Sequence, residues 1–447
     1  MPPMIVTDSA SAESLKEVNV GSIELVSRNC HLQEYKKKVV NALNLSGDFI
    51  AFASPDSSYA VTKRLLDAAQ KSILIGIYDF TAGYMKDILL NAMHRGVKVA
   101  LMLDLDGVAG EKPIFDDLKK FGCEAVAAPS CASDAISFFP SSHEKVVVID
   151  DTWTLVQSGN YSKNSIPLNE KDGGDPANFV TGNRDMGVAI RSKPLAKFFT
   201  KILRSDMKLE TNAEGVEALH RAIRRKRAPD LVEAVPEALP PKLFPSKKFN
   251  PTSPIKVVPV LTPDNYMDVV PDFIKKAKKS ILIEQQYIRG SHTRVITLLN
   301  AIRFAMDQNP NLDVRIILGK IFSQSDLQKE KANLDNIKKV FKLSLGTNIR
   351  FIDIKRFVHC HNKLVIVDNQ AALVSSQNWS ETGVGTNREA GLVIYYPDVA
   401  RYFSNIFESD WSTALKTFPK IGGGSVGPES LARGNFMEVS AADYQEV

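Results

Sequence analysis

Two short segments of the sequence each place a histidine two residues before a lysine and end in an aspartate. In both segments the lysine begins a run of branched apolar residues, which is typical of a buried strand. The corresponding residues of the two segments are all 218 positions apart, which indicates an internal duplication. The residues are His143, Lys145 and Asp150 in the first segment and His361, Lys363 and Asp368 in the second.

The combination of histidine and lysine is suited to phosphodiester cleavage. Side chains alternate along a strand, so His143 and Lys145 project to the same side, as do His361 and Lys363. An ammonium group can hold phosphate oxygens while a neutral imidazole attacks phosphorus. A second imidazole can protonate the leaving oxygen and then deprotonate the incoming water or alcohol. The two copies therefore predict one shared site that works through a phosphohistidine.

The repeat continues beyond these segments. Asn160 and Asn378 follow the two segments, again 218 positions apart. Further on, the pair Arg184-Asp185 corresponds to the pair Arg388-Glu389. A repeated asparagine and a repeated acid after each segment extend the duplication over most of a domain.

With these motifs the sequence resembles the phospholipase D superfamily, which has two H-x-K-x4-D motifs, a following Ser-x-Asn and an acidic residue. The resemblance covers about residues 50–417. It implies that His143 is the nucleophile and His361 the acid and base, although the sequence alone leaves this order open. It also implies phosphate-binding and histidine-orienting groups, and this chemistry requires no metal or other cofactor. The phosphate-binding candidates are Lys145, Lys363, Asn160 and Asn378, and the orienting candidates are Asp185 and Glu389.

Asp150 and Asp368 complete the motifs and belong to the catalytic candidates. We interpret them as turn or bracing residues, because an aspartate at a strand exit is a common turn signal. Tyr161 and Trp379 follow the two asparagines, and we expect them to pack beneath the site. His359 stands close to His361, but the second ligand pair of a zinc site is absent, so we expect no metal there.

Strand and helix patterns alternate through both halves of the sequence. This alternation predicts an α/β fold made of two similar α/β/α sandwich halves with mixed central sheets, related by a pseudo-two-fold axis. The expected units are a leader with a helix at 1–45, a first domain at 46–208, a linker at 209–254, a second domain at 255–420 and a tail at 421–447. The loops at 127–142 and 171–177 are expected to border the site.

Composition limits the location and the partners. The chain has 447 residues and a net charge of +5, which favours an anionic partner such as nucleic acid or an acidic membrane surface. We expect no Sec signal peptide, because the first residues lack a basic start and an apolar core. No apolar run reaches spanning length, and the four cysteines show no disulfide or metal spacing. We therefore expect a cytoplasmic monomer that contacts anionic surfaces peripherally, with export by another route left open.

Two substrate classes remain open. The segment Ile283-Glu-Gln-Gln-Tyr287 and the segment Gly182-Asn-Arg-Asp185 resemble segments of membrane-acting phospholipases. The tyrosine and tryptophan after the two asparagines are closer to the nuclease branch. We expect a phosphodiesterase or phosphatidyltransferase that acts on phospholipid head groups, with a metal-independent nuclease of DNA or RNA as the alternative. Both motifs are intact, which disfavours a scaffold without activity.

Overall fold

The computed structural model describes residues 35–105, 108–130, 138–175, 182–211 and 242–419. Most of the expected leader, including its helix, lies outside these residues. So do most of the expected linker with its basic run at 224–227, the expected tail, and parts of both loops that were expected to border the site.

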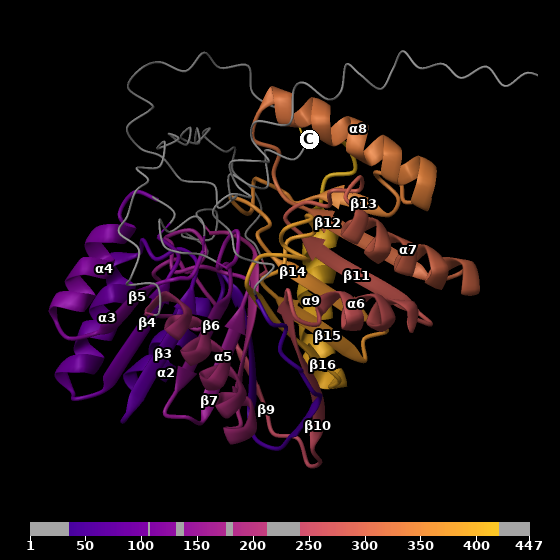
Figure 1. Cartoon of the computed structure of the whole chain (residues 1–447). Coiled ribbons are helices and arrows are strands. Elements are labelled where there is room, and N and C mark those ends of the chain that lie inside the picture. Colours follow the sequence, from indigo (N-terminus) through magenta and orange to yellow (C-terminus); the bar gives the residue numbers. More distant parts are fainter. Residues whose placement is uncertain (1–34, 106–107, 131–137, 176–181, 212–241, 420–447) are drawn as a thin grey trace, which may run out of the picture.

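Two mixed sheets of eight strands form the centre of the protein (Figure 1). In order across the first sheet the strands are β5 (Glu124–Ala127), β4 (Lys98–Leu103), β3 (Ser72–Ile77), β6 (Lys145–Ile149), β7 (Trp153–Gln157), β8 (Asp185–Arg191), β2 (Phe49–Ser54) and β9 (Lys247–Phe249). Across the second they are β13 (Ile349–Phe351), β12 (Asp313–Leu318), β11 (Ser280–Gln285), β14 (Lys363–Val367), β15 (Ala371–Ser375), β16 (Glu389–Ile394), β10 (Ile255–Thr262) and β1 (Leu43–Leu45). The orders correspond strand for strand, which confirms the predicted pair of similar α/β halves.

Each sheet has a parallel part and an antiparallel part. The strands β3, β4 and β5 run parallel, as do β11, β12 and β13, whereas the remaining neighbours are antiparallel. The strands β6 and β14, which follow His143 and His361, lie where the two parts meet, next to β3 and β11. All five residues of β6 and of β14 are buried. Their branched apolar side chains suit a strand that is covered on both faces.

The two halves exchange an edge strand. β1 precedes the first sheet in the chain but pairs with β10 of the second sheet. β9 lies within the expected linker segment and pairs with β2 of the first sheet. Each sheet is therefore completed by a strand from outside its own half, which joins the halves through backbone hydrogen bonds.

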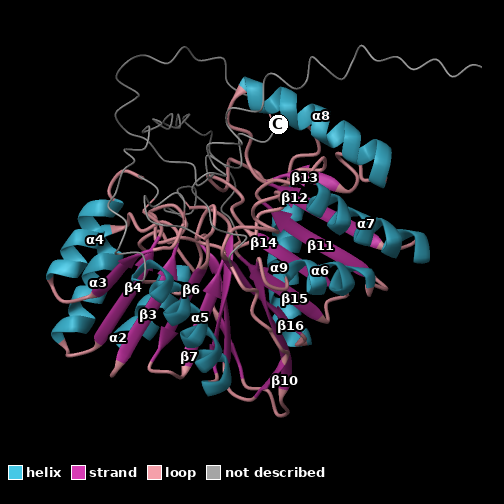
Figure 2. Ribbon diagram, in the orientation of Figure 1, coloured by secondary structure: helices cyan, strands magenta, loops and turns pink. Residues whose placement is uncertain are grey.

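Helices cover the outer faces of both sheets (Figure 2). Two further helices, α5 and α9, lie on the inner side, in a hydrophobic core that contains side chains from both sheets. The outer helices are α2 (Ser58–Asp67), α3 (Gly83–His94) and α4 (Glu111–Lys120) in the first half and α6 (Tyr266–Lys275), α7 (Thr293–Gln308) and α8 (Gln324–Phe341) in the second; α5 is Lys193–Thr211 and α9 is Pro397–Thr413. The shared core holds the starts of β6 and β14 on rigid backbone.

Candidate active site

Backbone hydrogen bonds join each histidine segment to the opposite half of the protein. Arg388, just before β16, donates its N–H to the carbonyl of Ser141 at 2.8 Å and accepts the N–H of His143 at 2.7 Å. The equivalent bonds of Arg184, just before β8, go to His359 at 2.8 Å and from His361 at 3.0 Å. These bridges place the starts of β6 and β14 across the pseudo-two-fold axis.

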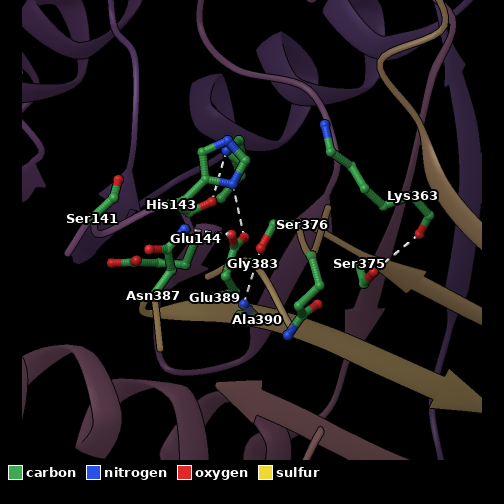
Figure 3. A network of polar contacts seen from close by, with 12 residues as sticks. Ser141, His143, Glu144, Lys363, Ser375, Ser376, Gly383, Asn387, Glu389 and Ala390 are labelled. Carbon is green, nitrogen blue, oxygen red and sulfur yellow. Dashed lines mark hydrogen bonds and ion pairs between the residues drawn. The ribbon is translucent and has the colours of Figure 1, made fainter. Parts of the chain in front are cut away.

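Each histidine is oriented by an acid from the other half. Nδ1 of His143 lies 2.8 Å from Oε2 of Glu389 (Figure 3). Nδ1 of His361 lies 2.9 Å from Oδ1 of Asp185. All four side chains are buried. An Nδ1–H that donates to a carboxylate leaves Nε2 as the atom that carries out chemistry.

Two buried lysines bring positive charge to the histidines. The Nζ atom of Lys145 donates to the carbonyl of His143 at 2.7 Å and lies 5.0 Å from the ring centre of Tyr78. The Nζ atom of Lys363 donates to the carbonyl of His361 at 2.6 Å and lies 2.9 Å from Nε2 of the same ring. This charge is suited to holding a phosphate between the rings.

The environment of His143 favours its neutral form. Burial lowers the pKa of His143 well below its usual range, and the charges of Lys145 and Lys363 lower it further. Tyr78 packs edge-on against the His143 ring, with the ring centres 4.5 Å apart. A neutral ring held by Glu389 has a nucleophilic nitrogen at neutral pH.

The two asparagines offer unused polar atoms. Both side-chain polar atoms of Asn160 are buried and have no hydrogen-bond partner in the described part of the chain. The same is true of Oδ1 of Asn378. Leaving a buried amide unpaired costs about 1–3 kcal/mol, so a ligand that bonds these atoms would recover that free energy. A phosphate oxygen is the partner that suits the Asn160 amide N–H.

Asp150 and Asp368 lie at the far ends of β6 and β14, away from the histidines. Asp150 accepts the backbone N–H groups of Gln70, Lys71 and Ser72 at 2.7–2.9 Å. Asp368 accepts those of residues 278–280 in the same way. Both have positive φ, 53° and 56°. In the structure their carboxylates join each catalytic strand to the start of its neighbour.

Two buried arginines next to the orienting acids also cross between the halves. Each bonds one acid of its own half and one acid on the inner helix of the other half, and Arg184 stacks on Phe357 at 4.3 Å. The ion pairs are Arg184 to Asp56 at 2.6 Å and to Asp410 of α9 at 2.7 Å, and Arg388 to Asp264 at 2.6 Å and to Asp206 of α5 at 2.8 Å. This arrangement fixes the backbone from which Asp185 and Glu389 extend.

Comparison with known proteins identifies the duplicated unit. The sequence matches the family described as "Cardiolipin synthase, PLD-like domain" over residues 62–207 and 270–411, one match for each half. The chain belongs to the phospholipase D superfamily. A search of curated protein sequences finds no match.

The similarity to one solved structure, a phosphatidylserine synthase, shows the fold. Phosphatidylserine synthase of Haemophilus influenzae is 14% identical, with a TM-score of 0.55, over 89% of this chain and 92% of that chain. The phospholipase D family member Nuc of Salmonella typhimurium is 22% identical, with a TM-score of 0.30, over 36% of this chain and 95% of that chain. NucT of Helicobacter pylori is 16% identical, with a TM-score of 0.29, over 36% of this chain and 98% of that chain.

Each half of this phospholipase D fold also buries a glutamate beneath the site. Burial raises the pKa of Glu284 in β11 to about 8 and that of Glu144 to about 7. Glu284 accepts a bond from Asn362 at 2.9 Å, and Asn362 accepts one from Ser158 at 3.2 Å. Ser158 donates to the orienting acid Asp185 at 2.7 Å. The network thus connects Glu284 with the acid that holds His361.

The glutamates occupy exchanged positions in the two halves. Glu284 of β11 corresponds to Gly76 of β3, and Asn362 corresponds to Glu144. A side chain at Gly76 would meet Glu144, whose Oε1 lies 3.1 Å from the Cβ position. Each half therefore has room for one such carboxyl, supplied from either of two adjacent strands.

Several of these residues were missed by sequence reasoning. The acids Asp206 and Asp410 are 204 positions apart, as are Arg184 and Arg388, and this shared offset is the signal that was available.

Tyr161 and Trp379 are fully buried, and Nε1 of Trp379 donates to the hydroxyl of Tyr266 at 3.2 Å. Within the described residues no group of three or more acidic, histidine or cysteine side chains has a metal-binding arrangement.

Proposed function

We propose that the protein transfers or hydrolyses the head group of a phospholipid through a phosphohistidine on His143. The observation that carries the proposal is the crosswise pair of oriented histidines, in which His143 is buried and its pKa is lowered. Nε2 of His143 attacks phosphorus, and His361 protonates the departing alcohol oxygen. His361 then removes the proton from water or a second alcohol, which releases His143.

The polar groups around the rings have distinct parts in this scheme. The ammonium groups of Lys145 and Lys363 and the amide groups of Asn160 and Asn378 hold the non-bridging oxygens as negative charge grows. Asp185 and Glu389 keep each ring in the tautomer that has its lone pair on Nε2.

Phospholipid is favoured over nucleic acid by the sequence family, whose description names cardiolipin synthase. The segment from Ile283 to Tyr287 adds to this, because it resembles a segment of membrane-acting phospholipases. No helix in the described residues is both long and apolar enough to cross a bilayer. We infer peripheral access to the substrate at the surface of a membrane.

The test is a parallel assay of the purified protein on mixed phospholipid vesicles and on single- and double-stranded DNA and RNA. We expect release or exchange of a lipid head group, and acid quenching should trap label on His143. His143→Ala and His361→Ala should each lower the rate by several orders of magnitude, without additive effects. Cleavage of nucleic acid without any lipid reaction would establish the nuclease alternative instead.

We also propose that one chain contains the whole site, because each histidine already meets an acid of the other half. A mixture of the His143→Ala and His361→Ala proteins should then remain inactive. Restored activity in the mixture would mean that sites are assembled between chains.

A further inference from the structure

The pseudo-symmetry of the two halves breaks beside the catalytic histidines. The first residue after β4 is Asp104, and the first after the corresponding β12 is Gly319. The residue two positions before the catalytic histidine is Ser141 in the first half and His359 in the second. Two equivalent positions therefore carry different chemistry on the His143 side and on the His361 side.

On the His143 side the space is filled by a self-contained network. Asp104 is fully buried and accepts the hydroxyls of Ser130 at 2.7 Å and Ser141 at 3.0 Å. It also accepts the backbone N–H of Ser142 at 2.7 Å. These bonds occupy the carboxylate with groups of the protein itself.

On the His361 side the protein forms a small hollow of about 40 Å³ that is open to solvent. A Cβ at Gly319 would lie 2.2 Å from the His359 ring, so the glycine allows that ring to form one wall. The ring centres of His359 and His361 are 6.4 Å apart, so His359 separates the hollow from the His361 ring by one side chain. A space of this size admits a group of a few atoms and no acyl chain.

The charges that line this hollow are unbalanced. Its lining has three cations and two acids, which leaves a net charge of +1. Glu330 pairs with Arg289 at 3.3 Å, whereas Asp326 accepts only the neutral Ser323 hydroxyl at 2.6 Å and keeps its charge. Lys320 and Lys329 also line the hollow, and neither forms an ion pair with any residue that the structure describes. A lining of net positive charge, with two ammonium groups outside any described ion pair, favours an anion.

We propose that this hollow binds an anionic group, of the phosphate type, carried by the alcohol that leaves from or attacks phosphorus beside His361. The inference rests on the proposed function for the role of His361. In the transfer step His361 takes the proton of the alcohol, the alcohol oxygen forms the new P–O bond, and the bond between phosphorus and His143 breaks. Lys320 and Lys329 hold the anionic end and so select alcohols that carry one.

Binding is tested first, without any dependence on activity. Calorimetry with the purified full chain compares glycerol 3-phosphate with glycerol, which differ by one phosphate. We expect glycerol 3-phosphate to bind at least about tenfold more tightly. The double variant Lys320→Gln/Lys329→Gln should lose that preference. Lys338→Gln/Lys339→Gln, two exposed lysines at the far end of α8, should keep it. Equal binding of the two compounds by the wild-type protein would overturn the proposal.

Transfer is tested second, with the two compounds as acceptors for the phosphatidyl group of a vesicle lipid. We expect the Lys320→Gln/Lys329→Gln variant to raise KM for glycerol 3-phosphate about tenfold and to leave KM for glycerol unchanged. Selective binding without any reaction of lipid would retain the anion site and refute the proposed function. Tighter binding of a dinucleotide, with displacement of glycerol 3-phosphate, would overturn the assignment of the site to a lipid alcohol.

Discussion

Replacing Glu284 with glutamine removes a buried ionisable group and keeps its shape. The side chain is fully buried in β11, and its Oε2 accepts a bond from Asn362 at 2.9 Å. The glutamine oxygen can accept the same bond, so the variant should fold as the wild-type protein does. What changes is the dependence of stability on pH.

The structure determines the sign and size of this effect. Burial, with a contribution from Asp410, raises the pKa of Glu284 from 4.5 to about 8. Because the folded-state pKa is the higher one, the stability that this group contributes is fully present below pH 4.5 and is lost as pH rises towards 8. Between these two pKa values, each rise of one pH unit lowers the free energy of unfolding by about 1.4 kcal/mol. From pH 5 to pH 8 the free energy of unfolding of the wild-type protein should therefore fall by about 3–4 kcal/mol more than that of the variant.

Urea unfolding of both proteins at pH 5, 6.5 and 8 measures the difference, because other titrating groups cancel in the comparison. The free energy of unfolding of the Glu284→Gln variant, relative to that of the wild-type protein, should rise steadily from pH 5 to pH 8. Glu170→Gln, at an exposed position, is the matched control and should show no such trend. If the difference for Glu284→Gln stays constant within about 0.5 kcal/mol, Glu284 is already ionised in the folded protein and the reasoning is wrong.

Three further predictions concern the site and its support. Asp185→Asn and Glu389→Gln should each lower kcat by about 10²–10⁴-fold with a much smaller change in KM, because each acid orients an imidazole; near-normal kcat in steady-state assays would contradict this role. Asp410→Asn should destabilise the protein by about 3 kcal/mol in urea unfolding, because it leaves the buried Arg184 charge with one acid, whereas the exposed Glu408→Gln should cost less than about 1 kcal/mol. Activity should persist in excess EDTA, because lysine and asparagine side chains hold the phosphate; loss that Mg²⁺ or Zn²⁺ restores would refute this.

The fold class could be predicted because local patterns repeat. The apolar run after Lys145 and the one after Lys363 are too short for helices and too apolar for exposed strands. Their common offset made the duplication visible without any structure. The exchanged strands β1 and β9 escaped prediction because three residues carry too little periodicity, and their pairing depends on where the other half lies.

The sequence indicates candidate site residues but not which of them contact one another. The sequence places Asp185 after the first histidine and Glu389 after the second, yet each acid contacts the histidine of the opposite half. The reason is the bridge between Arg388 and the segment before β6, with its symmetric copy at Arg184. Such contacts between strand starts leave no local sequence pattern.

The sequence by itself determined which side chains are available for chemistry, because the spacing of histidine and lysine along a strand sets which of them share a face. It also determined that two such sets exist in one chain. The tertiary structure decided which acid contacts which histidine, how deeply Glu284 is buried, and that a hollow forms beside His359. These properties depend on distances between residues that are far apart in the chain, and burial and electric fields are set by those distances.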